Sequence, residues 1–229
     1  MKVELHSHTD VFSSCSRIAA PELIAMAEAS GYDAVFVTDH NKVWPAHDLA
    51  ALREHCERVR VLPGIEIALP DNHDILVLGA ESPIYESLHT PSEVLAQACA
   101  DGYLTVLAHP FRWHDALPEY CGLLDAIEVY TCNHPEDAQA AQAVAYAAQH
   151  NMAPVYSSDA HGLNFMNRFW IETDEPFDTP QELRRAILAG RYENRKRQTD
   201  AVLPPPFKAG SMAELAEEDL AGLYVQPTL

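Results

Sequence analysis

Short apolar runs alternate with longer amphipathic segments along most of the chain. The runs are rich in Val, Ile and Leu, a composition that favours β-strands, several of them buried on both faces. They lie at residues 3–5, 34–38, 59–62, 75–78, 104–108, 126–130 and 154–157, with a weaker run at 169–172. We expect one strand at each run.

The segments between these runs have helical periodicity. They lie at residues 21–30, 45–57, 91–100, 135–149 and 180–188, and each opens with proline, which is favoured in a first helical turn. Alternation of strand and helix predicts an α/β fold with a mainly parallel sheet. Seven or eight such units in a single domain predict a compact TIM-like barrel. A doubly wound sheet is the alternative, although no glycine-rich nucleotide-binding motif accompanies it.

The character of the chain changes after about Thr199. Residues 203–206 read Leu-Pro-Pro-Pro, a stiff extended element, and the acidic stretch 211–223 resembles a short helix. We therefore divide the chain into a barrel, residues 1–199, and a C-terminal tail or arm, residues 200–229.

The chain is strongly acidic. Its 229 residues include 34 acidic and 15 basic side chains, for a formal charge of −19. A surface of this charge repels nucleic-acid backbones and anionic membranes, so we expect neither long nucleic acid nor membrane as a partner. A small anionic substrate needs local cations, and bound metal ions would supply them.

The cysteines and the N-terminus indicate the compartment. Five cysteines at irregular spacing include no C-x-x-C pair, which argues against a disulfide framework and against a cysteine-based zinc knuckle. No N-terminal apolar stretch resembles a signal peptide, and no apolar run approaches the ~18 residues of a membrane helix. We expect a reduced, cytoplasmic protein, and leave its oligomeric state open.

Histidines and carboxylates follow five of the expected strands. The carboxyl ends of barrel strands meet at one face, so these side chains would become neighbours. Imidazole and carboxylate together suit Zn²⁺, Mn²⁺ or Fe²⁺. A single loop histidine is more often an ordinary polar residue, but joint occurrence at separate strand ends favours a site for two or three ions. The segments are His6-Ser7-His8-Thr9, Thr38-Asp39-His40-Asn41, Gly64-Ile65-Glu66, Ala108-His109-Pro110 and Ser158-Asp159-Ala160-His161.

The same segments, in the same order across residues 1–195, resemble the PHP family, named for polymerase and histidinol phosphatase. The resemblance implies a distorted (β/α)7 barrel with two or three metal ions at its mouth. It also implies hydrolysis of a phosphate ester.

Carried over by position, the resemblance implies a role for each residue. His6, His8 and Asp159 resemble ligands of one ion, Glu66 a bridge to a second ion held by His109, and His40 and His161 ligands of a third. We assign catalysis to Asp39 and Glu66. For Asp39, the alternative is that it orients its loop or a ligand imidazole.

Two positions depart from the family pattern. Many members carry an Asp or His shortly after the first motif, where this chain has Cys15. A thiolate ligand and a buried structural cysteine are both open there. Members often use another histidine before the His-Pro motif, and His73 is the candidate. Asp71 and Asn72 beside it equally favour a turn residue.

The resemblance predicts a hydrolase of a small phosphate monoester, such as a sugar, nucleotide or amino-alcohol phosphate. Arg17, Arg112 and Arg168 lie near motif ends and are candidates for binding its phosphate, or are ordinary surface charges. The alternatives are a phosphodiesterase on short oligonucleotides or cyclic nucleotides, a metal hydrolase of C–N bonds, and a non-catalytic metal-binding regulatory module.

Overall fold

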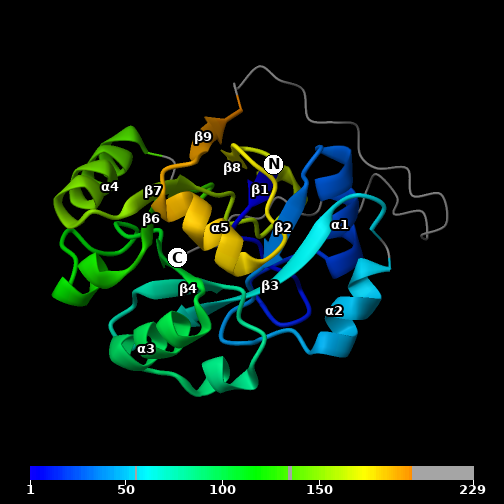
Figure 1. The fold of residues 1–229 in the computed structure, drawn as a ribbon, viewed down its shortest axis with the longest axis horizontal. Coiled ribbons are helices and arrows are strands. Elements are labelled where there is room, and N and C mark those ends of the chain that lie inside the picture. Colours follow the sequence, from blue (N-terminus) through cyan, green and yellow to red (C-terminus); the bar gives the residue numbers. More distant parts are fainter. Residues whose placement is uncertain (55, 134–135, 198–229) are drawn as a thin grey trace.

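The computed structural model describes residues 1–54, 56–133 and 136–197. Within them, nine strands form one mixed sheet that curls into a nearly closed barrel (Figure 1). The strands are β1 (Lys2–Glu4), β2 (Ala34–Val37), β3 (Arg60–Ala68), β4 (Asp74–Leu78), β5 (Leu104–Ala108), β6 (Ala126–Tyr130), β7 (Ala153–Tyr156), β8 (Phe169–Thr173) and β9 (Tyr192–Lys196). The helices are α1 (Ala20–Ala29), α2 (Ala46–Arg53), α3 (Pro91–Asp101), α4 (Asp137–His150) and α5 (Pro180–Leu188), with short 3-10 turns at η1 (Pro83–Ser87), η2 (Glu119–Leu123) and η3 (Leu163–Phe165).

The strand directions differ from the expected ones. The order is β7-β6-β5-β4-β3-β2-β1-β8-β9. Strands pair in parallel at β1–β2, β2–β3, β5–β6 and β6–β7, and antiparallel at β1–β8, β3–β4, β4–β5 and β8–β9. The barrel-like α/β fold is confirmed, but the prediction of a mainly parallel sheet is wrong.

A tight turn reverses β4. The Leu69 amide donates to the His73 carbonyl oxygen at 2.9 Å, and Asn72 has a φ of 62°. A connection this short joins only antiparallel strands, because a parallel crossover needs a dozen or more residues. The start of β4 therefore lies at the same edge of the sheet as the carboxyl ends of β3 and β5. Asp74 pairs there with Ala68 and Ala108.

Side chains join the two ends of the sheet. The Asn194 side chain of β9 accepts from the Tyr156 amide at 2.9 Å and donates to the Pro154 carbonyl oxygen at 2.7 Å. Ser158, just after β7, donates to the Phe169 carbonyl oxygen at 3.2 Å. These contacts hold β7 against β8 and β9.

Alternation along the strands sorts side chains between two apolar layers. In β4, Leu76 and Leu78 belong to the inner cluster, which α5 covers at one end through Leu183. Ile75 and Val77 belong to an outer cluster that packs under α3 and α4. In Figure 1, α1 and α2 lie on one side of the strands and α4 on the other. Since alternate residues share a face, Asp74 falls on the inner side.

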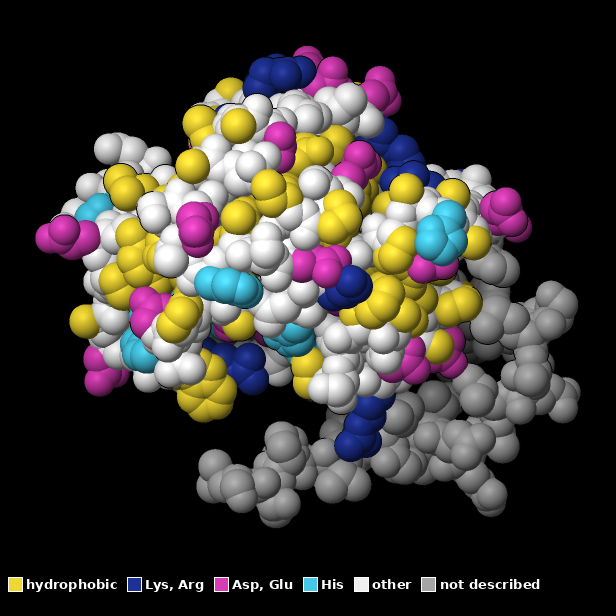
Figure 2. Space-filling model, turned by 90° about the horizontal axis from the view of Figure 1, so that it is seen from below, with side chains coloured by type: hydrophobic (Ala, Val, Ile, Leu, Met, Phe, Trp, Pro, Cys, Tyr) yellow, Lys and Arg dark blue, Asp and Glu magenta, His cyan; other side chains and the backbone are white. Residues whose placement is uncertain are grey.

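Figure 2 shows one face on which acidic side chains lie dispersed among apolar ones. That the protein binds neither long nucleic acid nor membrane remains a prediction. No helix among the described residues is long and apolar enough to cross a membrane. The expected tail, residues 200–229, lies outside the described residues.

We expect Gly79→Ala to destabilise the closed end of the barrel. Gly79 has a φ of 117°, and an added Cβ would lie 2.7 Å from Pro180 Cβ and against the ring of Tyr103. Strain and overpacking together should lower the free energy of unfolding by about 3 kcal/mol. Urea unfolding measures this effect. Gly190→Ala is the control, because Gly190 also has a positive φ of 67° but open space around it. It should cost about 1 kcal/mol, and equal losses at both sites would refute the steric argument.

Candidate metal centre

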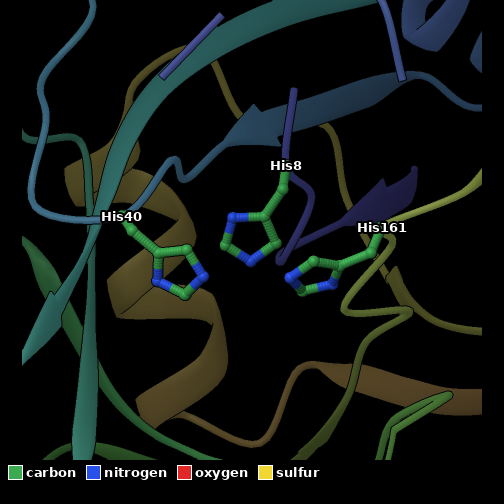
Figure 3. Close-up of side chains that lie close together, drawn as sticks. All are labelled: His8, His40 and His161. Atoms are coloured by element: carbon green, nitrogen blue, oxygen red, sulfur yellow. The ribbon is translucent and has the colours of Figure 1, made fainter. Parts of the chain in front are cut away.

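Histidines from separate loops meet at the open end of the barrel. His8 follows β1, His40 follows β2 and His161 follows β7. Figure 3 shows the His8 ring between the other two. The His8 ring centroid lies 4.5 Å from that of His40 and 4.3 Å from that of His161. The expectation that the strand ends bring these residues together is therefore met in the structure.

A first group of donor atoms surrounds His6 and His8. Their Nε2 atoms lie 2.9 Å apart. Glu66 Oε2 lies 3.2 Å from His8 Nε2 and 3.4 Å from His6 Nε2. Asp159 Oδ1 lies 3.4 Å from each of the two nitrogens. All four side chains are fully buried, and neither carboxylate oxygen has a hydrogen bond of acceptable geometry.

Glu66 also belongs to a second group. Its Oε1 lies 3.0 Å from His109 Nε2, and Asp74 Oδ2 lies 3.8 Å from the same nitrogen. One carboxylate thus presents one oxygen to each group. This is the arrangement of a bridging ligand between two cations.

A third group lies beside the first. His40 Nδ1 lies 2.8 Å from Glu66 Oε2, and His161 Nδ1 lies 3.3 Å from Asp159 Oδ1. Cys15 lies near enough to both imidazoles for them to lower the pKa of its thiol. Cys15 is exposed, so the structural alternative of a buried cysteine does not apply.

The electrostatics of these groups are strongly coupled. Burial alone would raise the pKa of Glu66, but the charge of His6, the hydrogen bond from His109 and the proximity of His40 hold that pKa well below its ordinary value. Burial opposes protonation of His40 and His161, yet their hydrogen-bonding neighbours raise the pKa of each to about 10. Burial would raise the pKa of the Cys15 thiol, but the two imidazoles outweigh this effect and lower the pKa to about 6. Without metal, protons on the imidazoles neutralise the negative charge of the buried carboxylates. A bound cation would displace these protons and take over that role.

Carboxylates behind the histidines orient the rings. Glu128 Oε1 lies 2.9 Å from His6 Nδ1 and accepts its hydrogen, which turns Nε2 toward the first group. Glu128 Oε2 accepts from the His109 backbone amide at 2.8 Å. Glu4 Oε1 accepts from the Ser158 amide at 2.9 Å and links the end of β1 to that of β7. Burial raises the pKa of Glu4 to about 7.

Backbone strain occurs at two of the candidate ligands. His109 has a φ of 28° and Asp159 a φ of 47°, values that side chains with a Cβ seldom adopt. Such strain is concentrated at functional sites, where the surrounding structure maintains it. Here it turns both side chains into the centre, His109 directly after β5 and Asp159 three residues after the end of β7.

Asp39 lies beside the cluster and not within it. Its carboxylate accepts hydrogen bonds from the Thr9 amide and hydroxyl, the Ser13 hydroxyl and the Trp44 indole. These four donors occupy both oxygens. Ser13 Oγ in turn lies 3.2 Å from His8 Nδ1. The geometry supports orientation of the loop and the His8 ring and gives Asp39 no direct contact with the donor groups.

His73 does not join the donor groups, contrary to the expectation from sequence. It is buried and stacks on His114, with ring centroids 4.2 Å apart. The next residue, Asp74, lies with Glu66 and His109 instead. The reversal of β4 explains the difference, because it directs the first residue of that strand inward.

The three arginines expected to bind phosphate form no ion pair with the carboxylates of the donor groups. Arg17 and Arg168 are exposed, and the Arg112 guanidinium lies 4.9 Å from the centroid of the Trp113 ring. None of the three forms an ion pair with another described residue. Their role in binding phosphate remains a prediction.

Sequence reasoning missed three acidic residues. Asp74 follows a turn, and the turn itself was the signal that β4 is antiparallel. Glu4 and Glu128 are charged residues inside otherwise apolar strands, and both are buried. A buried charge needs a partner, so such residues point to a polar interior.

Comparisons with known proteins agree with the resemblance. A family model described as PHP-associated matches residues 139–192. The matched segment comprises 54 of the 229 residues, and solved structures described as PHP-like share the fold. Curated protein sequences give no match.

Three solved structures illustrate the shared fold. PsfC from Pseudomonas syringae PB-5123 is 20% identical with a TM-score of 0.64, and the alignment covers 86% of this chain and 91% of that chain. A two-domain protein from Bacteroides vulgatus is described as containing a predicted PHP-like metal-dependent phosphoesterase. It is 17% identical with a TM-score of 0.64, and the alignment covers 86% of this chain and 64% of that chain. An amidohydrolase from Chromobacterium violaceum, with bound sulfate and no metal, is 14% identical with a TM-score of 0.53. The alignment covers 70% of this chain and 88% of that chain. At these identities, the likeness concerns the fold.

Proposed function

We propose that this protein is a metal-dependent phosphoesterase that hydrolyses a small phosphate monoester. The observation that carries the proposal is the set of overlapping donor groups that share Glu66. A protein described as containing a predicted metal-dependent phosphoesterase and an amidohydrolase, both of the same fold, support the broader class, a metal-dependent hydrolase.

The proposed ligands follow the three groups. His6, His8, Asp159 and one oxygen of Glu66 would hold one ion. His109, Asp74 and the other oxygen of Glu66 would hold a second. His40 and His161 would contribute to a third. The buried oxygens without hydrogen-bond partners fit this assignment, because an unpartnered buried acceptor is costly unless a cation satisfies it.

Zn²⁺, Mn²⁺ or Fe²⁺ bound there would activate water and neutralise charge on a phosphate ester. The protein contributes orientation. Glu128 fixes the His6 ring, and the Ser13–Asp39 pair fixes that of His8. Arg17, Arg112 and Arg168 are proposed to bind substrate phosphate, and the acidic surface disfavours long polymers as substrates.

Metal content and substrate class test the proposal together. The full chain, purified without chelator and without a histidine tag, should contain two or three equivalents of zinc, manganese or iron by plasma mass spectrometry. Phosphate monoesters should be hydrolysed faster than cyclic nucleotides, short oligonucleotides or amides. A chelator should abolish the activity, and added metal should restore it.

His47→Asn is the matched control, because this imidazole is 83% exposed on α2. It should retain both metal and activity. If diesters or amides were cleaved faster than monoesters, the protein would be assigned as a phosphodiesterase or a C–N hydrolase instead. Failure to bind metal even after its addition would overturn the enzymatic proposal and favour the regulatory module.

A further inference from the structure

Asn133 lies in the turn that follows β6, next to the loop that carries Asp159. Its side-chain nitrogen donates to Asp159 Oδ2 at 2.7 Å and to the Asp159 backbone carbonyl oxygen at 3.1 Å. An asparagine amide has two N–H groups, so one nitrogen can satisfy both acceptors. Asn133 therefore binds the backbone and the side chain of Asp159 at the same time.

Other bonds keep the two loops together without this side chain. The Cys132 amide donates to the Ser158 carbonyl oxygen at 3.0 Å, and the Cys132 thiol donates to the Phe165 carbonyl oxygen at 3.2 Å. The first of these bonds joins the residue before Asn133 to the residue before Asp159. Loss of the Asn133 amide should therefore leave the turn in place and free mainly the Asp159 carboxylate.

The two oxygens of the buried Asp159 carboxylate have different surroundings. Oδ2 accepts the hydrogen bond from Asn133. Oδ1 has no hydrogen bond of acceptable geometry and lies 3.4 Å from Nε2 of both His6 and His8. Rotation of the carboxylate would exchange its oxygens or present both to a cation. The bond to Asn133 opposes this rotation, so that Oδ1 faces the first donor group.

Backbone strain at Asp159 gives the second bond from Asn133 its importance. The φ of 47° at Asp159 is a value that residues with a Cβ seldom adopt. Such a conformation persists only where neighbouring groups maintain it. The bond to the Asp159 carbonyl oxygen acts on the strained residue itself. Asn133 thus supports the conformation that directs Asp159 into the centre.

We propose that Asn133 is a positioning residue, which holds Asp159 so that Oδ1 alone binds the ion shared with His6 and His8. In this role Asn133 acts only through Asp159. A neutral amide suits the role because it donates two hydrogen bonds and leaves the negative charge of the carboxylate available to a cation. The inference rests on the proposed metal centre, and its test measures metal binding without catalysis.

Stepwise titration of the metal-free full chain with Co²⁺, followed by the visible bands of the bound ion, tests the proposal. Asn133→Leu keeps the approximate size of the side chain and removes both N–H donors. One ion should then bind about 10–100-fold more weakly, the usual effect of a residue behind a ligand. Asn133→Ser retains one donor in a smaller side chain and should lose less affinity. Thermal unfolding in chelator shows whether each variant is folded before metal is added.

Gln97→Leu is the matched control. Gln97 Nε2 donates to Asp101 Oδ2 at 2.9 Å on α3, so the change removes the same kind of bond between an amide and a carboxylate. Asp101 belongs to none of the donor groups. Gln97→Leu should therefore bind Co²⁺ with the affinity of the wild type.

A double-mutant cycle separates positioning of Asp159 from a general effect on the barrel. Asp159→Asn should weaken binding of the same ion, and adding Asn133→Leu should weaken it further by about twofold or less, because Asn133 acts through that carboxylate. Losses that multiply in the double variant would overturn the inference. So would wild-type Co²⁺ affinity in folded Asn133→Leu or Asn133→Ser. Absence of cobalt bands from the wild type would instead overturn the proposed metal centre.

Discussion

Glu66→Gln is expected to abolish most activity and to lose at least one equivalent of bound metal. Glu66 presents one oxygen to the His6–His8 group and the other to His109, so the change removes a charge from both groups. Replacing a residue behind a metal ligand costs about 10–100-fold, and loss of a shared ligand should cost at least about 100-fold in kcat/KM. Plasma mass spectrometry and monoester kinetics measure the two effects.

Glu193→Gln is the control for this change. Glu193 is an exposed carboxylate on β9 that pairs with Arg195 and belongs to none of the donor groups. It should retain metal and activity. Thermal unfolding of both variants in chelator separates metal loss from misfolding, since Glu66→Gln removes a buried charge and should still fold. Full metal content in Glu66→Gln would contradict the bridging assignment.

Asp74→Asn and His73→Asn are expected to have opposite outcomes although the residues are adjacent. Asp74 Oδ2 lies 3.8 Å from His109 Nε2, in the second group, whereas His73 stacks on His114 outside it. Burial and repulsion from Glu66 raise the pKa of Asp74 to about 6, as expected of a carboxylate facing another. We expect Asp74→Asn to lose the second ion and at least about 10-fold in kcat/KM. His73→Asn should keep its metal.

Asp71→Asn provides a matched control in the same turn. Its carboxylate is 43% exposed and accepts from the Tyr120 hydroxyl at 2.7 Å, outside the donor groups. Asp74→Asn alone should therefore lose metal and activity, because of the three residues only Asp74 lies in a donor group. Loss of metal in His73→Asn but not in Asp74→Asn would reinstate the histidine that the sequence favoured.

Local patterns were sufficient to predict most of the elements and the main clustered residues. The apolar runs coincide with strands such as β5 and β6, because a strand buried on both faces requires continuous apolar character. His6, His8 and Asp159 were predicted to meet because each follows a strand, and strand ends share an edge. Neither step requires knowledge of strand order.

Strand direction was the first property that local patterns did not determine. The same run at residues 75–78 is compatible with either direction, and only its pairing with both β3 and β5 shows that it is reversed. Because of that reversal, the residue at the centre is Asp74 and not His73. The turn beside Asp71 was visible in the sequence, but its consequence for the site depends on the completed sheet.

The sequence by itself determined the α/β class, the approximate positions of every described strand except β9, and the histidines and carboxylates at strand ends, since periodicity and residue type are local properties. Only the tertiary structure decided which atoms face each other. It placed Asp39 behind His8, with Ser13 between them, and His40 beside His8. It also buried Glu128 against His6. These contacts join residues separated by as many as 122 positions, and distances over such separations follow from the packing of the whole barrel.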